Sequence, residues 1–194
     1  MAAATSNARY DTITVVLHWL TAFLVLALFG SAMAWSYLPR EMGLHWLAGL
    51  HVSFGVALAA VVGARLIWRL TLGRRLEDNP GKPAIRIAAR MMHLALYGLL
   101  LVQIALGFGI EWFGGSAISV FGVFEIPSPF AASRVVSGRI ENAHGVIAWT
   151  MMTLVGGHAI AALWHHYAAK DGVLARMLPL RARPVVTDTG APAE

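Results

Sequence analysis

Four of the eight histidines in this 194-residue chain fall inside long apolar segments. They are His18, His51, His144 and His158. An ionisable side chain inside a membrane is costly, and it is commonly functional. A single histidine there is usually explained by a hydrogen bond between helices. Four with a shared geometry favour metal ligation, since neutral imidazole binds a metal without adding charge to a low-dielectric interior.

The spacing of these histidines predicts two separate sites. His144 and His158 are 14 residues apart, so at about 100° per residue they point from one helix face. Their axial separation of ~21 Å is too long for one metal ion. Depth within the apolar segments then matches His18 with His158 near one surface and His51 with His144 near the other.

Two facing imidazoles indicate haem rather than zinc. A structural zinc site needs four protein ligands and a catalytic one usually three, whereas six-coordinate haem iron takes its other four ligands from the porphyrin. The chain has no cysteine, which excludes disulfides, iron–sulfur clusters and covalent c-type haem. Glycines close to the histidines suit a flat ring, although ordinary helix packing explains them equally well. They are Gly55, Gly145, Gly156 and Gly157.

Other polar residues near the ends of the spans each have a possible functional role and a possible structural role. Arg65 and Arg69 lie one turn apart and match the carboxylate geometry of haem propionates. Snorkelling toward lipid headgroups is the alternative, and it suits Arg69 better than the deeper Arg65. His93 and His165 are candidates for proton transfer or quinone contact, or are plain interfacial histidines.

The elements that must position these residues are four membrane-spanning helices. The chain is 58% hydrophobic and 13% charged, so water is not its main solvent. Its basic balance lacks the charged face of a nucleic-acid binder, so no nucleic-acid partner is expected. Four apolar segments are long enough to span a bilayer. They run over 12–35, 46–68, 91–112 and 143–167.

The charge distribution predicts the orientation. Eleven Lys and Arg residues lie on the side of the two termini, and only Arg40, Arg134 and Arg139 lie on the other side. The positive-inside rule then places both termini in the cytoplasm. We expect residues 113–142 to form the largest structure outside the bilayer, with an extended stretch at 126–129. Residues 1–180 form one domain, and 181–194 form a disordered cytoplasmic tail.

The sequence resembles the bacterial cytochrome b561 family over about residues 9–180. The matching pieces are Leu17-His18-Trp19, Leu50-His51-Val52-Ser53 with Gly55, the stretch from Arg65 to Arg69, His93 with Tyr97, His144, His158, His165-His166-Tyr167, Lys170-Asp171 and Met177-Leu178-Pro179. The resemblance implies an all-α, four-helix bundle of the bacterial inner membrane. It also implies two b-type haems in the bundle core and electron exchange with ubiquinone.

Some members of this family resemble superoxide oxidases, which pass an electron from superoxide to quinone. The expectation is therefore a superoxide:ubiquinone oxidoreductase embedded in membrane lipid. One alternative is a cytochrome subunit that carries electrons between quinone and a partner dehydrogenase. Another is a histidine-lined metal transporter without haem. A homo-oligomer is compatible with the sequence.

Overall fold

The computed structural model describes residues 9–44, 46–73 and 83–178 of the chain. Its elements, in order, are α1 (Thr12–Tyr37), the short η1 (Arg40–Met42), α2 (Trp46–Thr71), α3 (Pro83–Gly114), β1 (Ile118–Val120), β2 (Phe124–Ile126), α4 (Arg134–Trp164), the π-helical η2 (His165–Ala169) and η3 (Leu174–Arg176). The predicted tail at 181–194 lies outside the described residues.

Local sequence signals start the helices. The Asp11 side chain caps α1 by accepting from the Thr14 backbone N–H at 2.9 Å, and it also accepts the Trp68 indole N–H from α2 at 2.9 Å. Pro83 opens α3, where its missing N–H costs nothing. Ser133 caps α4 by accepting from the Val136 N–H.

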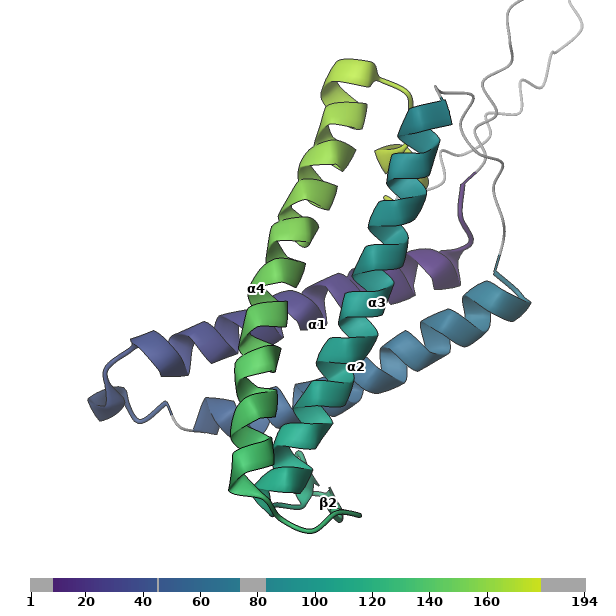
Figure 1. The fold of residues 1–194 in the computed structure, drawn as a ribbon. Coiled ribbons are helices and arrows are strands. Elements are labelled where there is room, and N and C mark those ends of the chain that lie inside the picture. Colours follow the sequence, from purple (N-terminus) through teal and green to yellow (C-terminus); the bar gives the residue numbers. More distant parts are fainter. Residues whose placement is uncertain (1–8, 45, 74–82, 179–194) are drawn as a thin grey trace, which may run out of the picture.

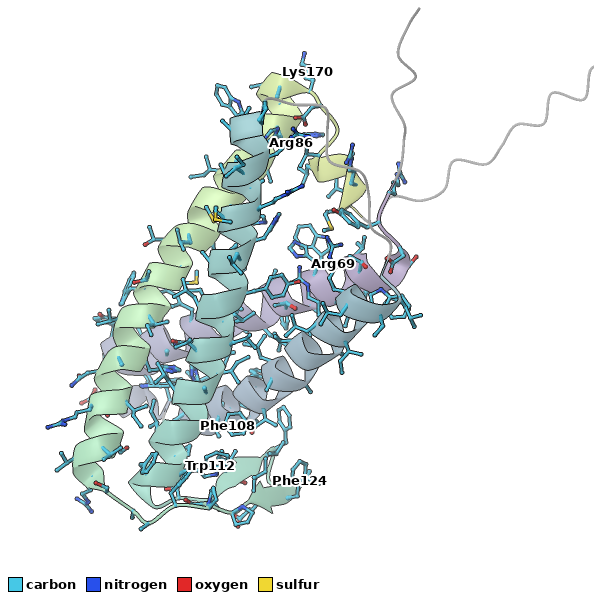
Figure 2. The ribbon with its side chains drawn as sticks, turned by 45° about the vertical axis from the view of Figure 1, so that its right-hand side comes forward. Arg69, Arg86, Phe108, Trp112, Phe124 and Lys170 are labelled. Carbon is cyan, nitrogen blue, oxygen red and sulfur yellow. The ribbon has the colours of Figure 1, made fainter. Side chains whose placement is uncertain are left out.

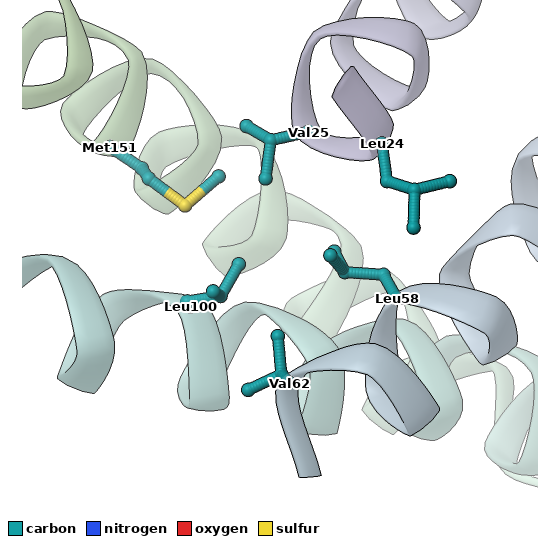
Figure 3. Packing of buried hydrophobic residues seen from close by; sticks show 6 residues of the cluster. All are labelled: Leu24, Val25, Leu58, Val62, Leu100 and Met151. Atoms are coloured by element: carbon teal, nitrogen blue, oxygen red, sulfur yellow. The ribbon is translucent and has the colours of Figure 1, made fainter. Parts of the chain in front are cut away.

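The helices form two antiparallel pairs that cross each other. Figure 1 shows α1 beside α2 and α3 beside α4, with the first pair passing across the second. All four helices contribute to one central hydrophobic cluster (Figure 3). It contains Leu24, Val25, Leu58, Val62, Leu100 and Met151. Many large apolar side chains elsewhere face outward, as expected of a protein solvated by lipid.

The prediction of four membrane-spanning helices is confirmed. All four α-helices, with α4 continuing to Ala169, are long and apolar enough to cross a bilayer. Two begin earlier than predicted: α3 at Pro83 rather than at residue 91, and α4 at Arg134 rather than at 143. The prediction counted only the apolar core of each span, and a helix continues through polar residues until a cap or proline ends it.

The loop between α3 and α4 is shorter than predicted, and it contains a β-hairpin that the sequence did not reveal. Strand β1 pairs antiparallel with β2, and its Ile118 and Val120 side chains are buried. The Ser53 hydroxyl on α2 accepts the Phe121 N–H at 2.9 Å and thereby ties the hairpin to the helix. We call this end of the molecule the hairpin side, and the end where α1 begins and α4 ends the termini side.

The Asp11 cap provides a test of how the start of α1 is held. Replacing Asp11 with Ala removes a helix cap and leaves the Trp68 indole without this acceptor, so we expect a loss of about 1–2 kcal/mol in stability. Thermal unfolding in detergent measures it. Asp11→Ser is the matched control because serine keeps the cap on a shorter side chain, and it should lose less. Equal losses in the two variants would contradict the role of the cap, since both lose the Trp68 bond and only serine keeps the cap.

Candidate functional site

The hairpin-side pair consists of His51 on α2 and His144 on α4. Their ring centroids are 6.3 Å apart and their planes are inclined at 67°. Their helices belong to different pairs, so the two imidazoles form a contact between the two helix pairs. The predicted partnership of these residues therefore corresponds to a close approach in space.

A backbone carbonyl fixes the protonation of His51. The Nδ1 atom of His51 lies 3.0 Å from the Leu28 carbonyl oxygen of α1 and 3.2 Å from the Ser31 hydroxyl. Since a carbonyl can only accept, Nδ1 carries the proton and Nε2 keeps its lone pair. This is the tautomer in which a histidine binds a metal through Nε2. The Trp35 ring packs against the same imidazole at 5.0 Å.

His144 contacts two residues of α3, but one of its ring nitrogens has no hydrogen-bond partner. The Gln103 side-chain amide donates to the His144 backbone carbonyl at 3.1 Å. A Cβ placed on Gly107 would lie 3.5 Å from His144 Cε1, so the imidazole packs close to the α3 backbone. Within the described part of the chain, the buried His144 Nδ1 and Gln103 Oε1 atoms have no hydrogen-bond partner.

The termini-side pair consists of His18 on α1 and His158 on α4. Their ring centroids are 6.4 Å apart with an interplanar angle of 73°, nearly the same geometry as the hairpin-side pair. The His93 ring of α3 lies 5.4 Å from that of His158. The structure thus places a third imidazole beside this pair, where the sequence offered His93 only two general readings.

Arg65 lies inside the termini-side site. Its guanidinium nitrogen is 3.0 Å from His18 Nδ1, and the group also stacks over the Tyr97 ring at 5.1 Å. A guanidinium has donors only, so in this arrangement His18 Nδ1 accepts and the imidazole proton sits on Nε2. Metal binding through Nε2 would require the other tautomer, in which Nδ1 carries the proton and does not accept from Arg65.

Arg69 and His165 lie apart from the paired imidazoles. The Arg69 guanidinium stacks over the Tyr10 ring at 5.5 Å, near the start of α1. His165 Nδ1 is 2.5 Å from an Asp171 carboxylate oxygen, and this pair holds the turn that follows α4. The chain then returns to α1, where the Trp19 indole donates to the Met177 carbonyl at 2.7 Å.

The two pairs lie on either side of the central cluster. Met151 belongs to that cluster and is seven residues from both His144 and His158, or about 10 Å along the helix in each direction. Figure 3 shows Met151 of α4 facing Val25 and Leu100. The apolar core therefore separates two similar polar sites along one helix.

The glycines singled out from the sequence are not needed for helix packing in this structure. A Cβ added at Gly55, Gly145, Gly156 or Gly157 would meet nothing within 4 Å. Close contacts occur instead at Gly107 and at Gly109, whose added Cβ would lie 3.2 Å from Ile140 Cδ1. Small residues on α3 thus let α4 approach, a role that the sequence reasoning did not assign.

Sequence reasoning also missed the groups that contact the paired histidines. The Leu28 carbonyl could not have been found, because backbone acceptors carry no sequence signal. Gln103 had a signal: it is the only glutamine in the chain and lies in the middle of an apolar span. A polar side chain in that position has to find a partner within the bundle.

The donor set favours two-ligand centres. Among the described residues, no group of three or more His, Cys, Asp or Glu side chains is placed to hold a metal ion, as a zinc site would require. A metal–imidazole bond is about 2 Å long and the ring centroid lies ~1.1 Å beyond the nitrogen, so two imidazoles that bind one iron between them would have centroids about 6.2 Å apart. Both pairs match this separation.

Fold and site together define a class: four-helix membrane proteins with paired histidines inside the bundle. The comparison with known families makes this more specific, because the sequence model of prokaryotic cytochrome b561 matches residues 9–180. The chain belongs to the prokaryotic cytochrome b561 family, which confirms the resemblance noted from the sequence.

Curated relatives align over most of their length. Cytochrome b561 homolog 2 of Escherichia coli is 34% identical over 176 residues, covering 88% of this chain and 91% of the relative. Probable superoxide oxidase CybB of Yersinia pestis is 28% identical over 171 residues, covering 88% and 96%. Cytochrome b562 of Cereibacter sphaeroides is 31% identical over 183 residues, covering 90% and 98%.

Family membership implies b-type haem, and the residues present fit it. Each pair supplies two imidazoles at a separation that would let both bind one iron. At the hairpin side, the proton of His51 is on Nδ1, so its Nε2 keeps the lone pair that could bind iron. The chain is therefore a membrane electron-transfer protein of a bacterial inner membrane.

Proposed function

We propose that this chain is a di-haem cytochrome b that oxidises superoxide and reduces ubiquinone. The observation that carries the proposal is the matched geometry of the two imidazole pairs, on opposite sides of the central cluster and at equal distances along α4. Such a pattern gives one-electron centres near both membrane surfaces. The relative named probable superoxide oxidase supports the choice of donor.

The proposed residues divide into ligands and supporting groups. His51 and His144 hold one haem b on the hairpin side, and His18 with His158 hold the other on the termini side. When bound, each haem supplies a centre that gains and loses one electron without moving protons. Arg65 would pair with a propionate of the termini-side group, and Arg69 would contribute positive charge further out.

The reaction balances with two donors per acceptor. Two superoxide ions lose one electron each and leave as two molecules of dioxygen. One ubiquinone gains these two electrons and takes up two protons to form ubiquinol. The chain's own part is to hold the ligand imidazoles, to keep water out of the core through the Met151 cluster, and to admit the two substrates at the membrane surfaces.

The charges on the hairpin side do not favour long-range attraction of an anion. Arg40, Arg134 and Arg139 share this end with four glutamates: Glu41, Glu111, Glu125 and Glu141. The end as a whole is therefore not positive, and attraction of superoxide has to come from local placement. Arg139 is exposed on α4 five residues before His144, which makes it the best-placed cation.

Alanine substitution tests the ligand pairing. We expect His51→Ala or His144→Ala to remove the hairpin-side haem, and His18→Ala or His158→Ala to remove the other, each lowering the content from about two to about one haem per chain. Haem-to-protein ratios of purified variants measure this. His166→Ala is the control because that ring packs on Tyr167 at the end of α4. Full retention of both haems in any ligand variant would refute its assignment.

Reporter fusions test the proposed orientation, in which both termini are cytoplasmic. Alkaline phosphatase fused at the C-terminus should be inactive, because the eleven basic residues on that side stay in the cytoplasm. The same reporter inserted after Ser128, in the loop beyond the β-hairpin, should be active. The reverse pattern would overturn the orientation and move the superoxide side to the cytoplasm.

The enzymatic assignment requires a direct assay. Haem-loaded protein in liposomes that contain ubiquinone should consume superoxide faster than it decays spontaneously, with ubiquinol formed at one molecule per two superoxide ions. Arg139→Gln should slow the reaction at low salt and have less effect at high salt. If loaded protein does not accelerate superoxide loss, the superoxide oxidase assignment fails. The better account is then a cytochrome subunit that carries electrons between quinone and a partner dehydrogenase.

A further inference from the structure

Two buried polar atoms of residues that contact each other lack partners at the hairpin-side site. Among the described residues, His144 Nδ1 and Gln103 Oε1 are both enclosed and unpaired. Gln103 is 9% exposed, and a buried polar atom without a hydrogen bond is destabilising. These two atoms are chemically complementary, since an amide oxygen accepts and an imidazole N–H donates.

The Gln103 amide is already attached to the same residue. Its NH2 group donates to the His144 backbone carbonyl at 3.1 Å. Because a carbonyl can only accept, this end of the amide has to be the nitrogen, and the oxygen end remains available. Gly107 lies one turn further along α3 and faces the Cε1 atom of His144. The His144 imidazole therefore packs against the same face of α3 that carries Gln103.

We infer that Gln103 is a positioning residue for His144, with its Oε1 atom accepting the Nδ1–H of the ligand imidazole. The inference rests on the proposed function. Binding of iron through Nε2 requires the proton on Nδ1, and a ligating histidine normally donates that proton to a nearby acceptor. His51 has such an acceptor in the Leu28 carbonyl. Gln103 supplies the equivalent acceptor for His144. Its amide would then bind the same residue twice, through the nitrogen to the backbone carbonyl and through the oxygen to the imidazole.

The strength of this hydrogen-bond acceptor should change the midpoint potential of the iron bound to His144. A better acceptor makes the imidazole more electron-donating, which stabilises the oxidised iron and lowers its midpoint potential. Gln103→Glu offers a stronger acceptor, while Gln103→Leu offers none at similar size. The two variants should shift the potential of the hairpin-side haem in opposite directions, downward for Glu and upward for Leu. Gln103→Leu should also weaken retention of this haem by roughly 10- to 100-fold.

A redox titration of purified, haem-loaded protein tests this, with each haem identified by its loss in His51→Ala or His18→Ala. The matched control is Thr150→Val, which removes an exposed hydroxyl of α4 that bonds only to the Val146 carbonyl among its described contacts. It should leave both potentials unchanged. The termini-side haem should keep its potential in both Gln103 variants.

The outcomes separate the possible failures. Shifts in the same direction in the Glu and Leu variants, equal shifts of both haems, or no shift would overturn the role of Gln103 and leave the di-haem assignment intact. If Gln103→Leu loses the haem altogether, the Glu variant decides: a lowered potential supports the inference and an unchanged one overturns it. A wild-type protein that holds no haem on His144 would instead refute the proposed function.

Discussion

An imidazole inside a membrane needs a partner for each of its two nitrogens, and the rest of this structure follows from that constraint. At His51 the protein supplies one partner, the Leu28 carbonyl, and thereby leaves the second nitrogen for a metal. At His144 the amide of Gln103 is in reach of the same task. At His18 the nitrogen is held by Arg65, which is a donor and so favours the opposite tautomer. The two sites are thus similar in the geometry of their imidazole pairs, but they differ in which histidine tautomer their neighbours favour.

The paired histidines also join the two halves of the fold. His18 and His51 come from the α1–α2 pair, whereas His144 and His158 both come from α4. Figure 2 views these crossed pairs from another side, with Arg69 on α2 and Trp112 at the far end of α3. Apart from the hairpin, the pairs meet mainly at the central cluster. A metal centre on each side of that cluster would add two further connections between the helix pairs. Metal binding and folding should therefore be coupled.

Much of this arrangement could be predicted from the sequence because it depends on simple periods. Apolar length gives the four spans, and the 14-residue spacing puts His144 and His158 on one face. The β-hairpin could not be predicted in the same way, because its strands are only three residues long and depend on a contact with Ser53 of α2. The closeness of His93 to His158, and of Arg65 to His18, depends on how the helices rotate against each other, which no single span determines.

Fixed charges around the two sites give the proposed electron path a direction. Arg65 places a positive charge within the termini-side site, beside Tyr97 of α3, whether or not it contacts His18. The described partners of the hairpin-side pair are neutral, namely Leu28, Ser31 and Gln103, and Glu141 lies one turn before His144 on α4. An added electron is stabilised near a positive charge and destabilised near a negative one, and more strongly in a low-dielectric interior. On the proposed function, electrons that enter on the hairpin side are therefore drawn across the Met151 cluster toward Arg65, whatever their donor.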